Sequence, residues 1–199
     1  MPDLKNAWKN KNVFQKQLDL NLKELKNKES YPPHWNNCIL HINNFKPKNI
    51  LDIGCGCGAF SKVISEQFPD MEYTGMDYSE DAIKLAKETW ESDSFMVNDV
   101  MDLKEEDVSD YDLLFVGALF DVMPNGDEAM EHLMSICSTS MLISRMKLTE
   151  NESFYTTYIA YDEIETCAYH HSVNNFVDLC EKYSYDIYHI QSDIYLVKR

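Results

Sequence analysis

The chain begins with apolar residues at helical spacing. Four of them recur every three or four positions between residues 12 and 28, namely Phe14, Leu18, Leu22 and Leu25. This spacing predicts an amphipathic helix. The sequence YPPHW interrupts the pattern, because its two prolines lack amide donors and disfavour helical backbone before them. Apolar residues from Trp35 to Phe45 predict a second helix, which ends before Pro47.

From residue 49 onward, short apolar runs alternate with amphipathic ones. The predicted strands have the sequences NILDIG, EYTGMD, SFMVND, YDLLFVGALF and SMLISRM. Helices are predicted over AFSKVISEQF, EDAIKLAKETW, residues 127–137 and residues 173–183, and YDIYHI with DIYLVKR predicts a closing hairpin. This alternation is typical of an α/β fold with a sheet that is parallel except for the hairpin. Ligands of such sheets bind at the carboxyl ends of the strands.

The charge balance narrows the classes of partner. The 199 residues carry 34 acidic and 18 basic side chains, for a formal net charge of −16. A duplex-binding surface needs clustered Lys and Arg, so this composition disfavours a nucleic-acid partner. The basic run LKNAWKNKN near the start is interpreted as a solvated helix end rather than as a nucleic-acid contact.

Cysteine usage and hydropathy bear on the compartment. The six cysteines do not form the dense framework of a disulfide-stapled secreted module. The start of the chain is polar and rich in lysine, without the apolar core of a signal peptide. No apolar run approaches the roughly 18 residues that span a bilayer. We therefore expect a reduced, cytoplasmic protein without a membrane partner, and the sequence leaves its oligomeric state open.

The stretch NILDIGCGCGAFS holds three of the six glycines, Gly54, Gly56 and Gly58. Glycines after a strand allow a tight turn and a close approach of ligand to backbone. The spacing differs from the G-x-G-x-x-G of dinucleotide enzymes, and no Lys-Ser/Thr follows as in a P-loop. The C-x-C between the glycines lacks a second pair of ligands, so no metal site is predicted.

Three acids fall at the ends of the first three predicted strands. Asp77 ends the second strand, where a carboxylate can accept both hydroxyls of a ribose. Asp99 ends the third, where it can accept from an adenine amino group. Asp52 ends the first, near the expected position of a ligand ammonium. The three acids suit a ligand with a sugar, a base and a cationic amino-acid tail, and they would repel a pyrophosphate.

These motifs together resemble those of the class I S-adenosylmethionine-dependent methyltransferases. LDIGCGCG is similar to their first motif, GMDYS to the second, NDVMDL to the third and YDLLFVGALFDVM to the fourth. The resemblance covers Asn49 to about Met146, and it implies a Rossmann-like, mostly parallel seven-stranded sheet with an antiparallel last strand, flanked by helices. It implies S-adenosylmethionine as cofactor, with site residues Asp52, Gly54, Gly56, Gly58, Asp77, Tyr78, Asp99, Val100 and Gly117.

Candidates for a catalytic base come from the region after the fourth strand and from histidines. Many small-molecule members of the family carry histidine after that strand, where this chain has Leu119, Phe120 and Asp121. Asp121 is the first candidate, followed by His34 and by the pair His170 and His171, because histidine titrates near neutral pH. Structural roles compete: Asp121 can cap a turn, His34 can pack on Trp35, and the histidine pair can begin a helix. Some amine acceptors need no base.

The acceptor remains open at the level of sequence. Residues 1–45 are predicted to be a helical extension of the 46–199 domain, acting as a lid on the cofactor or as padding for the sheet. The aromatic segment FYTTYIAYDEIETCAYHH is predicted to form an acceptor pocket, a β-rich edge or a dimer surface. The predicted function is methyl transfer to O or N of a small-molecule or sugar-like acceptor. Two alternatives are a protein or RNA methyltransferase with a partner subunit and a non-catalytic cofactor-binding module.

Overall fold

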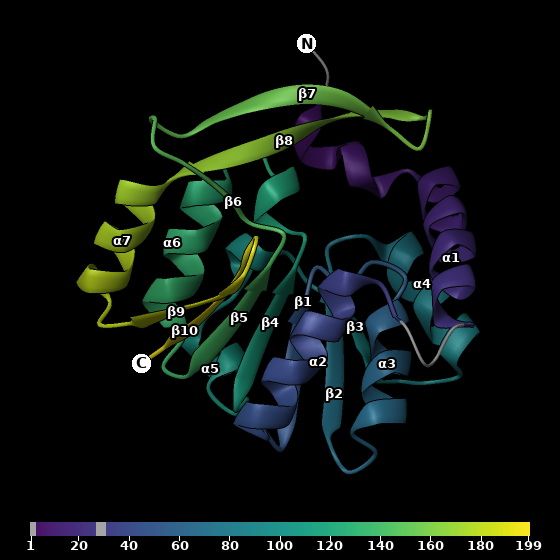
Figure 1. Cartoon of the computed structure of the whole chain (residues 1–199). Coiled ribbons are helices and arrows are strands. Elements are labelled where there is room, and N and C mark those ends of the chain that lie inside the picture. Colours follow the sequence, from purple (N-terminus) through teal and green to yellow (C-terminus); the bar gives the residue numbers. More distant parts are fainter. Residues whose placement is uncertain (1–2, 27–30) are drawn as a thin grey trace.

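The computed structural model describes residues 3–26 and 31–199, and its centre is a seven-stranded sheet (Figure 1). The strand order is β3-β2-β1-β4-β5-β10-β9. The strands span Asn49–Ile53 (β1), Glu72–Asp77 (β2), Phe95–Val97 (β3), Leu113–Gly117 (β4), Ser140–Ser144 (β5), Asp186–Gln191 (β9) and Ile194–Lys198 (β10). Strands β1 to β5 are parallel, and β10 is antiparallel to both of its neighbours. The predicted sheet, with its antiparallel last strand, is confirmed.

Helices cover both faces of this sheet. They span Pro33–Phe45 (α2), Ala59–Gln67 (α3), Glu80–Trp90 (α4), Glu105–Val108 (α5), Gly126–Ile136 (α6) and Val173–Lys182 (α7). Side chains alternate along β1, so Ile50 packs against α2 and α3 while Leu51 packs in the core that α6 and α7 cover. Single turns of 3-10 helix, Val100–Asp102 (η2) and Phe120–Val122 (η3), follow β3 and β4.

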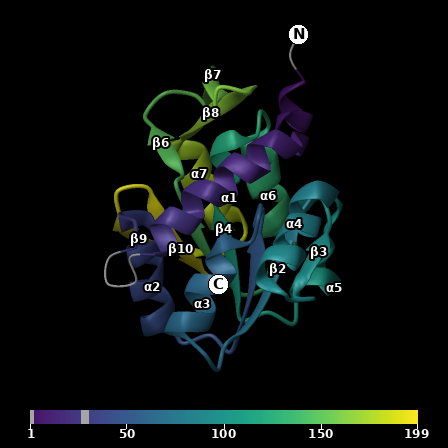
Figure 2. The ribbon, with the colours of Figure 1, turned by 90° about the vertical axis from the view of Figure 1, so that its right-hand side faces the viewer.

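A second, smaller sheet and the first helices lie at the carboxyl ends of the main strands. The small sheet has the order β6-β8-β7, with β6 at Lys147–Thr149, β7 at Phe154–Ala160 and β8 at Ile164–Ser172. Strands β7 and β8 form an antiparallel hairpin. The 3-10 helix η1 (Leu4–Lys9) lies under this hairpin, and α1 (Lys11–Leu25) runs on beside it (Figures 1 and 2). The two helices of the predicted extension thus differ in position. Helix α2 packs on a face of the sheet, and α1 lies at the carboxyl ends of its strands.

Several predicted boundaries are wrong by a few residues. The predicted end of the first helix is not one of them, because residues 27 and 28 lie outside the described residues, in which α1 spans Lys11–Leu25. Strand β3 ends at Val97, so Asp99 lies in the following loop, where it caps η2. Strand β4 ends at Gly117, and the next residues turn into η3. A single turn of 3-10 helix is too short to produce a periodic apolar pattern in the sequence.

The predicted fifth strand also ends early. Strand β5 stops at Ser144, because Arg145 has left-handed backbone (φ +67°) that a strand cannot contain. The chain then leaves the main sheet and enters the smaller one through β6. Of the three readings of the aromatic segment, the β-rich one describes its backbone, as the β7–β8 hairpin. Within the described ranges, no helix has the length and apolarity that a membrane crossing requires.

Candidate cofactor and acceptor site

A cavity of about 420 Å³ lies at the carboxyl ends of the parallel strands. Its floor comes from the ends of β1, β2, β4 and β5 and from the loop after β3, and its cover comes from η1, α1 and the β7–β8 hairpin. The volume lies in the range of small-molecule and cofactor sites, about 300–1,000 Å³. The cavity is where the alternating strands and helices of the sequence predict a ligand.

The glycine loop forms one wall of the cavity. Gly54, Gly56 and Gly58 have φ values of +79°, +55° and +73°, which residues with a Cβ rarely adopt. The amide N–H groups of Gly54 and Cys55 donate to the carbonyl of Met76, at 2.8 and 2.9 Å, and fasten the loop to β2. Gly54 and Gly56 line the cavity. Gly58 instead faces the core, where a Cβ would lie 2.5 Å from the ring of Phe95.

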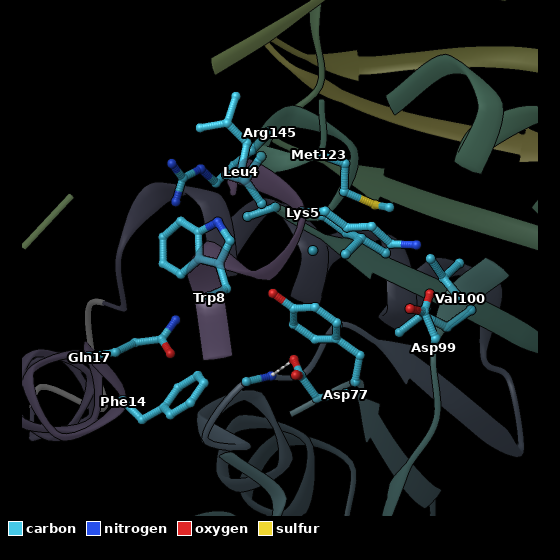
Figure 3. Close-up of a pocket in the computed structure, with 18 of the residues that line it drawn as sticks. Leu4, Lys5, Trp8, Phe14, Gln17, Asp77, Asp99, Val100, Met123 and Arg145 are labelled. Atoms are coloured by element: carbon cyan, nitrogen blue, oxygen red, sulfur yellow. Dashed lines mark hydrogen bonds between the residues drawn. The ribbon is translucent and has the colours of Figure 1, made fainter. Parts of the chain in front are cut away.

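Asp77 links the glycine loop to the end of β2 (Figure 3). One carboxylate oxygen accepts from the amide of Gly56 at 3.0 Å, and the other accepts from the amide of Ser79 at 2.9 Å. Burial raises the pKa of Asp77, and these two N–H donors oppose that rise. A carboxylate has about four acceptor positions, so two remain for hydroxyls of a ligand in the cavity that Asp77 lines.

Four further predicted residues line the same cavity: Tyr78, Asp99, Val100 and Gly117. Asp99 accepts from the amide of Met101 through one oxygen, at 3.0 Å. Lys9 of η1 lies 4.8 Å from the centre of the Tyr78 ring, which ties the cover to the end of β2. The structure therefore brings seven of the nine predicted cofactor residues together around one space.

Asp52 is not among the residues that line the cavity. The hydroxyl of Tyr73 donates to its carboxylate at 2.6 Å, and only 3 % of the residue is exposed. Side chains alternate along β1, so Ile53 reaches the cavity while Asp52 lies between the sheet and the helices on the other face. Burial raises the pKa of Asp52 to about 7.

This raised pKa predicts a pH-dependent stability. Because the folded pKa of Asp52 exceeds its ordinary value of 3.8, the fold favours the protonated carboxyl, and stability is lost as pH rises from about 4 towards 7. The Asp52→Asn variant keeps an acceptor for Tyr73 and has no charge to bury. We expect the free energy of unfolding of this variant, relative to wild type, to rise by about 2–3 kcal/mol between pH 5 and pH 8.

Urea unfolding at the two pH values measures this difference. Asp70→Asn, at an exposed turn, is the matched control and should follow wild type at both. An Asp52→Asn protein whose stability runs parallel to wild type from pH 5 to pH 8 would contradict the assignment.

Asp121 lies beside the cavity rather than on its wall. It is 8 % exposed in η3, and one of its oxygens has no hydrogen-bond partner among the described residues. The other oxygen lies 3.8 Å from a guanidinium nitrogen of Arg145. Burial raises the pKa of Asp121 to about 6, against the opposing effect of Arg145.

The candidate histidines lie outside the cavity lining. His34 packs its ring 5.6 Å from that of Trp35, and burial lowers its pKa. His170 stacks on Phe154, with ring centres 4.8 Å apart. His171 is fully buried, and its Nδ1 lies 2.6 Å from a carboxylate oxygen of Asp127. The packing role predicted for His34 describes its contact with Trp35. The structural role predicted for the pair is wrong, because His170 and His171 lie in β8 and α7 begins only at Val173.

The two cysteines of the loop make only weak contacts. The Sγ of Cys55 lies 3.7 Å from the carbonyl of Gly56, and that of Cys57 lies 3.8 Å from the side-chain oxygen of Gln17 in α1. In the part of the chain that the structure describes, no group of three or more His, Cys, Asp or Glu side chains is placed to hold a metal ion.

Several cavity residues were not predicted individually from the sequence. Lys5 and Trp8 of η1 and Phe14 and Gln17 of α1 reach in from the cover (Figure 3). The only signal for them is the prediction that the first helices could act as a lid. Arg145 and two tyrosines also line the cavity. Tyr158 and Tyr161 belong to the aromatic segment, whereas nothing in the local pattern marks Arg145.

Comparison with known proteins supplies an independent view of the chain. Residues 51–139 match a family described as "Methyltransferase domain". A malonyl-[acyl-carrier protein] O-methyltransferase of Ilyobacter polytropus is 37% identical over 98 residues, 48% of this chain and 37% of that protein. A trans-aconitate 2-methyltransferase of Rhodopseudomonas palustris is 29% identical over 89 residues, 45% of this chain and 34% of that protein. The chain thus matches little more than a third of the length of these relatives.

A solved structure extends the likeness of fold to nearly the whole chain. Human N-acetylserotonin methyltransferase in complex with S-adenosylmethionine aligns with 99% of this chain and 59% of its own, with a TM-score of 0.65 and 14% sequence identity. At that identity, the alignment supports the fold alone. It includes the residues that form the cover of the cavity.

Proposed function

The chain carries a class I S-adenosylmethionine-dependent methyltransferase domain, and we propose that it transfers a methyl group to O or N of a small-molecule acceptor. One observation carries the proposal: a single cavity is lined both by the glycine loop with Asp77 and Asp99 and by the side chains of the cover. The first set suits the cofactor, and the second leaves a neighbouring space for an acceptor.

The residues present fit the cofactor. Left-handed glycines at 54 and 56 keep Cβ atoms out of the cavity, where they would lie 3.0 Å from Leu119 and Gln17. Asp77 offers carboxylate acceptors for ribose hydroxyls, and Asp99 and the backbone of Val100 can hold the edge of an adenine. Gly117 lines the cavity at the end of β4, where a Cβ would lie 2.8 Å from the ring of Phe115. The acids would stabilise a cationic ligand and repel a pyrophosphate.

Methyl transfer then depends on alignment. S-adenosylmethionine supplies a methyl group on a positively charged sulfur. The ends of β4 and β5 and the covering segments orient an acceptor against it and exclude water, and such positioning can supply much of the rate enhancement. Asp121, with its pKa near 6, remains our candidate base. Because it does not line the cavity, it could take a proton only from an acceptor that reaches past Arg145. His34 and His170 stay candidates without a cavity contact.

The two alternative functions are less well supported. A pocket filled by side chains would support the non-catalytic hypothesis, and the cavity of about 420 Å³ removes that support. A protein or RNA acceptor would have to insert its reactive group beneath both η1 and the β7–β8 hairpin. Isolation of the protein with a stable partner subunit would favour that alternative.

The proposal is tested in two steps. Calorimetry with S-adenosylhomocysteine should show saturable binding at one site per chain, and an acceptor screen with isotopically labelled S-adenosylmethionine should give a product heavier by one labelled methyl group. Absence of S-adenosylhomocysteine binding to folded protein would reject the proposal. Binding without transfer to any acceptor would instead favour the non-catalytic module.

A further inference from the structure

Arg145 lies at the junction between the cofactor residues and the space that we assign to the acceptor. It directly follows Ser144, the last residue of β5, and Ser144 pairs with Gly117 at the end of β4. In the view of Figure 3, Arg145 and Trp8 lie on one side of the cavity, and Asp99 and Val100 lie on the other. The charge of Arg145 therefore lies on the side of the cavity that we assign to the acceptor, and not on the side of the residues that we assign to the nucleoside.

The backbone of Arg145 is strained. Eight non-glycine residues in the described part of the chain have positive φ, and most lie in helix C-caps or hairpin turns: Lys46, Glu91, Tyr161, Asp162, Ser184 and Ser192. The other two are Ala118 and Arg145, with φ of +57° and +67°. Each directly follows a strand end, and both line the cavity. Strain at adjacent strand ends is a recurrent feature of ligand sites.

The guanidinium of Arg145 has N–H donors that are free to bind a ligand. Within the described residues its one ionic contact is Asp121, at 3.8 Å, which is too long for a hydrogen bond. Its side chain is half exposed, and a guanidinium has five N–H donors. The chain has one other arginine, Arg199, which donates to the carbonyl of Cys137. Arg145 is therefore a cation with unused hydrogen-bond donors on a cavity wall, in a protein whose net charge is −16.

Other donors line the same cavity. Tyr158 and Tyr161 contribute from the β7–β8 hairpin, and burial raises the pKa of both phenols, which keeps them protonated. The indole N–H of Trp8 is not one of them, because its nitrogen has almost no accessible surface although it lacks an acceptor among the described residues. Donors without matching acceptors favour a ligand that is rich in oxygen acceptors and negatively charged.

We propose that the acceptor is a carboxylic acid, that Arg145 binds its carboxylate, and that the product is the methyl ester. This inference rests on the proposed function. The guanidinium fork matches a planar carboxylate with two parallel hydrogen bonds. With this acceptor Asp121 is not needed as the base, and its buried carboxylate instead lies 3.8 Å from the guanidinium of Arg145 as a neighbouring charge.

The chemistry balances without a base. A bond forms between a carboxylate oxygen and the methyl carbon, and the sulfur–methyl bond breaks with its electron pair going to sulfur. The negative charge of the acid and the positive charge of the sulfonium disappear together, and no proton is released. A carboxylate acceptor needs no base, and none of the candidate bases Asp121, His34 and His170 lines the cavity.

The test uses protein loaded with S-adenosylhomocysteine and matched pairs of probes. The acids trans-aconitate, malonyl-pantetheine and benzoate are compared with the corresponding amides, and inorganic phosphate serves as a non-planar anion. We expect at least one acid to bind, with its amide at least tenfold weaker and phosphate weaker still. Acid and amide affinities that are equal, or an absence of binding by all three acids, would overturn the proposal while leaving that of cofactor binding intact.

Variants at position 145 separate recognition from structure. Arg145→Gly removes both the cation and the backbone strain, so we expect acid affinity to fall about 30-fold or more, with thermal midpoint equal to or above wild type and S-adenosylhomocysteine affinity unchanged. Arg145→Lys keeps the charge without the fork and should lose less. Arg199→Met is the matched control and should bind acids as wild type does. Wild-type acid affinity in Arg145→Gly would overturn the proposal.

Discussion

Replacement of Asp77 by alanine is expected to weaken S-adenosylhomocysteine binding about 100-fold. The carboxylate would accept two ribose hydroxyls, and each hydrogen bond to a charged group contributes about 1.5–3 kcal/mol. A loss near 3 kcal/mol corresponds to a factor of about 100 in dissociation constant. The variant also leaves the buried amides of Gly56 and Ser79 without their acceptor, so the glycine loop loses one of its attachments to β2 while the bonds to the carbonyl of Met76 remain.

Calorimetry with three variants and wild type separates the loss of the ribose hydrogen bonds from the loss of the loop attachment. Asp77→Asn retains one acceptor oxygen and should fall between wild type and Asp77→Ala. Asp70→Ala removes an exposed carboxylate from a turn and should bind as wild type does. Circular dichroism establishes that each variant is folded. An Asp77→Ala protein that is folded and binds S-adenosylhomocysteine within threefold of wild type would exclude this carboxylate from the cofactor site.

Replacement of Gly58 by alanine is expected to lower the free energy of unfolding by about 3 kcal/mol. Left-handed backbone at φ +73° costs an alanine about 1–2 kcal/mol. The new methyl group would also lie 2.5 Å from Cε1 of Phe95, a ring that is 2 % exposed, and overpacking of this kind costs about 1–3 kcal/mol. Chemical denaturation measures the sum.

Two further variants isolate the clash from the strain. At Gly56 the added methyl group meets only the end of the Gln17 side chain, so Gly56→Ala should cost less than Gly58→Ala. Phe95→Leu shortens the opposing ring and should recover part of the loss in the Gly58→Ala, Phe95→Leu double variant. Equal losses for Gly56→Ala and Gly58→Ala, with no coupling to Phe95, would contradict the packing role of Gly58.

The main sheet, and the position of many predicted site residues around one cavity, could be predicted from the sequence for a shared physical reason. Both depend on local signals, which are apolar runs of strand length and polar residues or glycines where those runs end. Gly54, Asp77 and Val100 follow such signals and line the cavity. Asp52 carries the same signal but lies one residue before the strand end, on the opposite face from Ile53.

The side of the cavity that we assign to the acceptor could not be predicted in the same way. Arg145 is placed by a left-handed turn without glycine, and the cover by η1, which is too short to show periodicity. Trp8 comes close to Tyr161, with ring centres 6.3 Å apart, only because segments distant in sequence pack together. Long-range packing of this kind has no local signature, whereas the glycine loop is contained in one stretch.

The two parts of the cover meet through an apolar cluster and a polar contact. Val13 of α1 is fully buried and packs with Ala160 and Ile164 of the hairpin. Lys16 of α1 donates to the carbonyl of Tyr161 at 2.9 Å and pairs with Glu163 at 2.7 Å, and both charged side chains are partly exposed. Such an ion pair contributes about 1 kcal/mol or less, so the burial of the apolar side chains is the larger part of the attachment between α1 and the hairpin. A ligand that enters or leaves beneath this cover would therefore have to separate buried apolar side chains as well as an exposed ion pair.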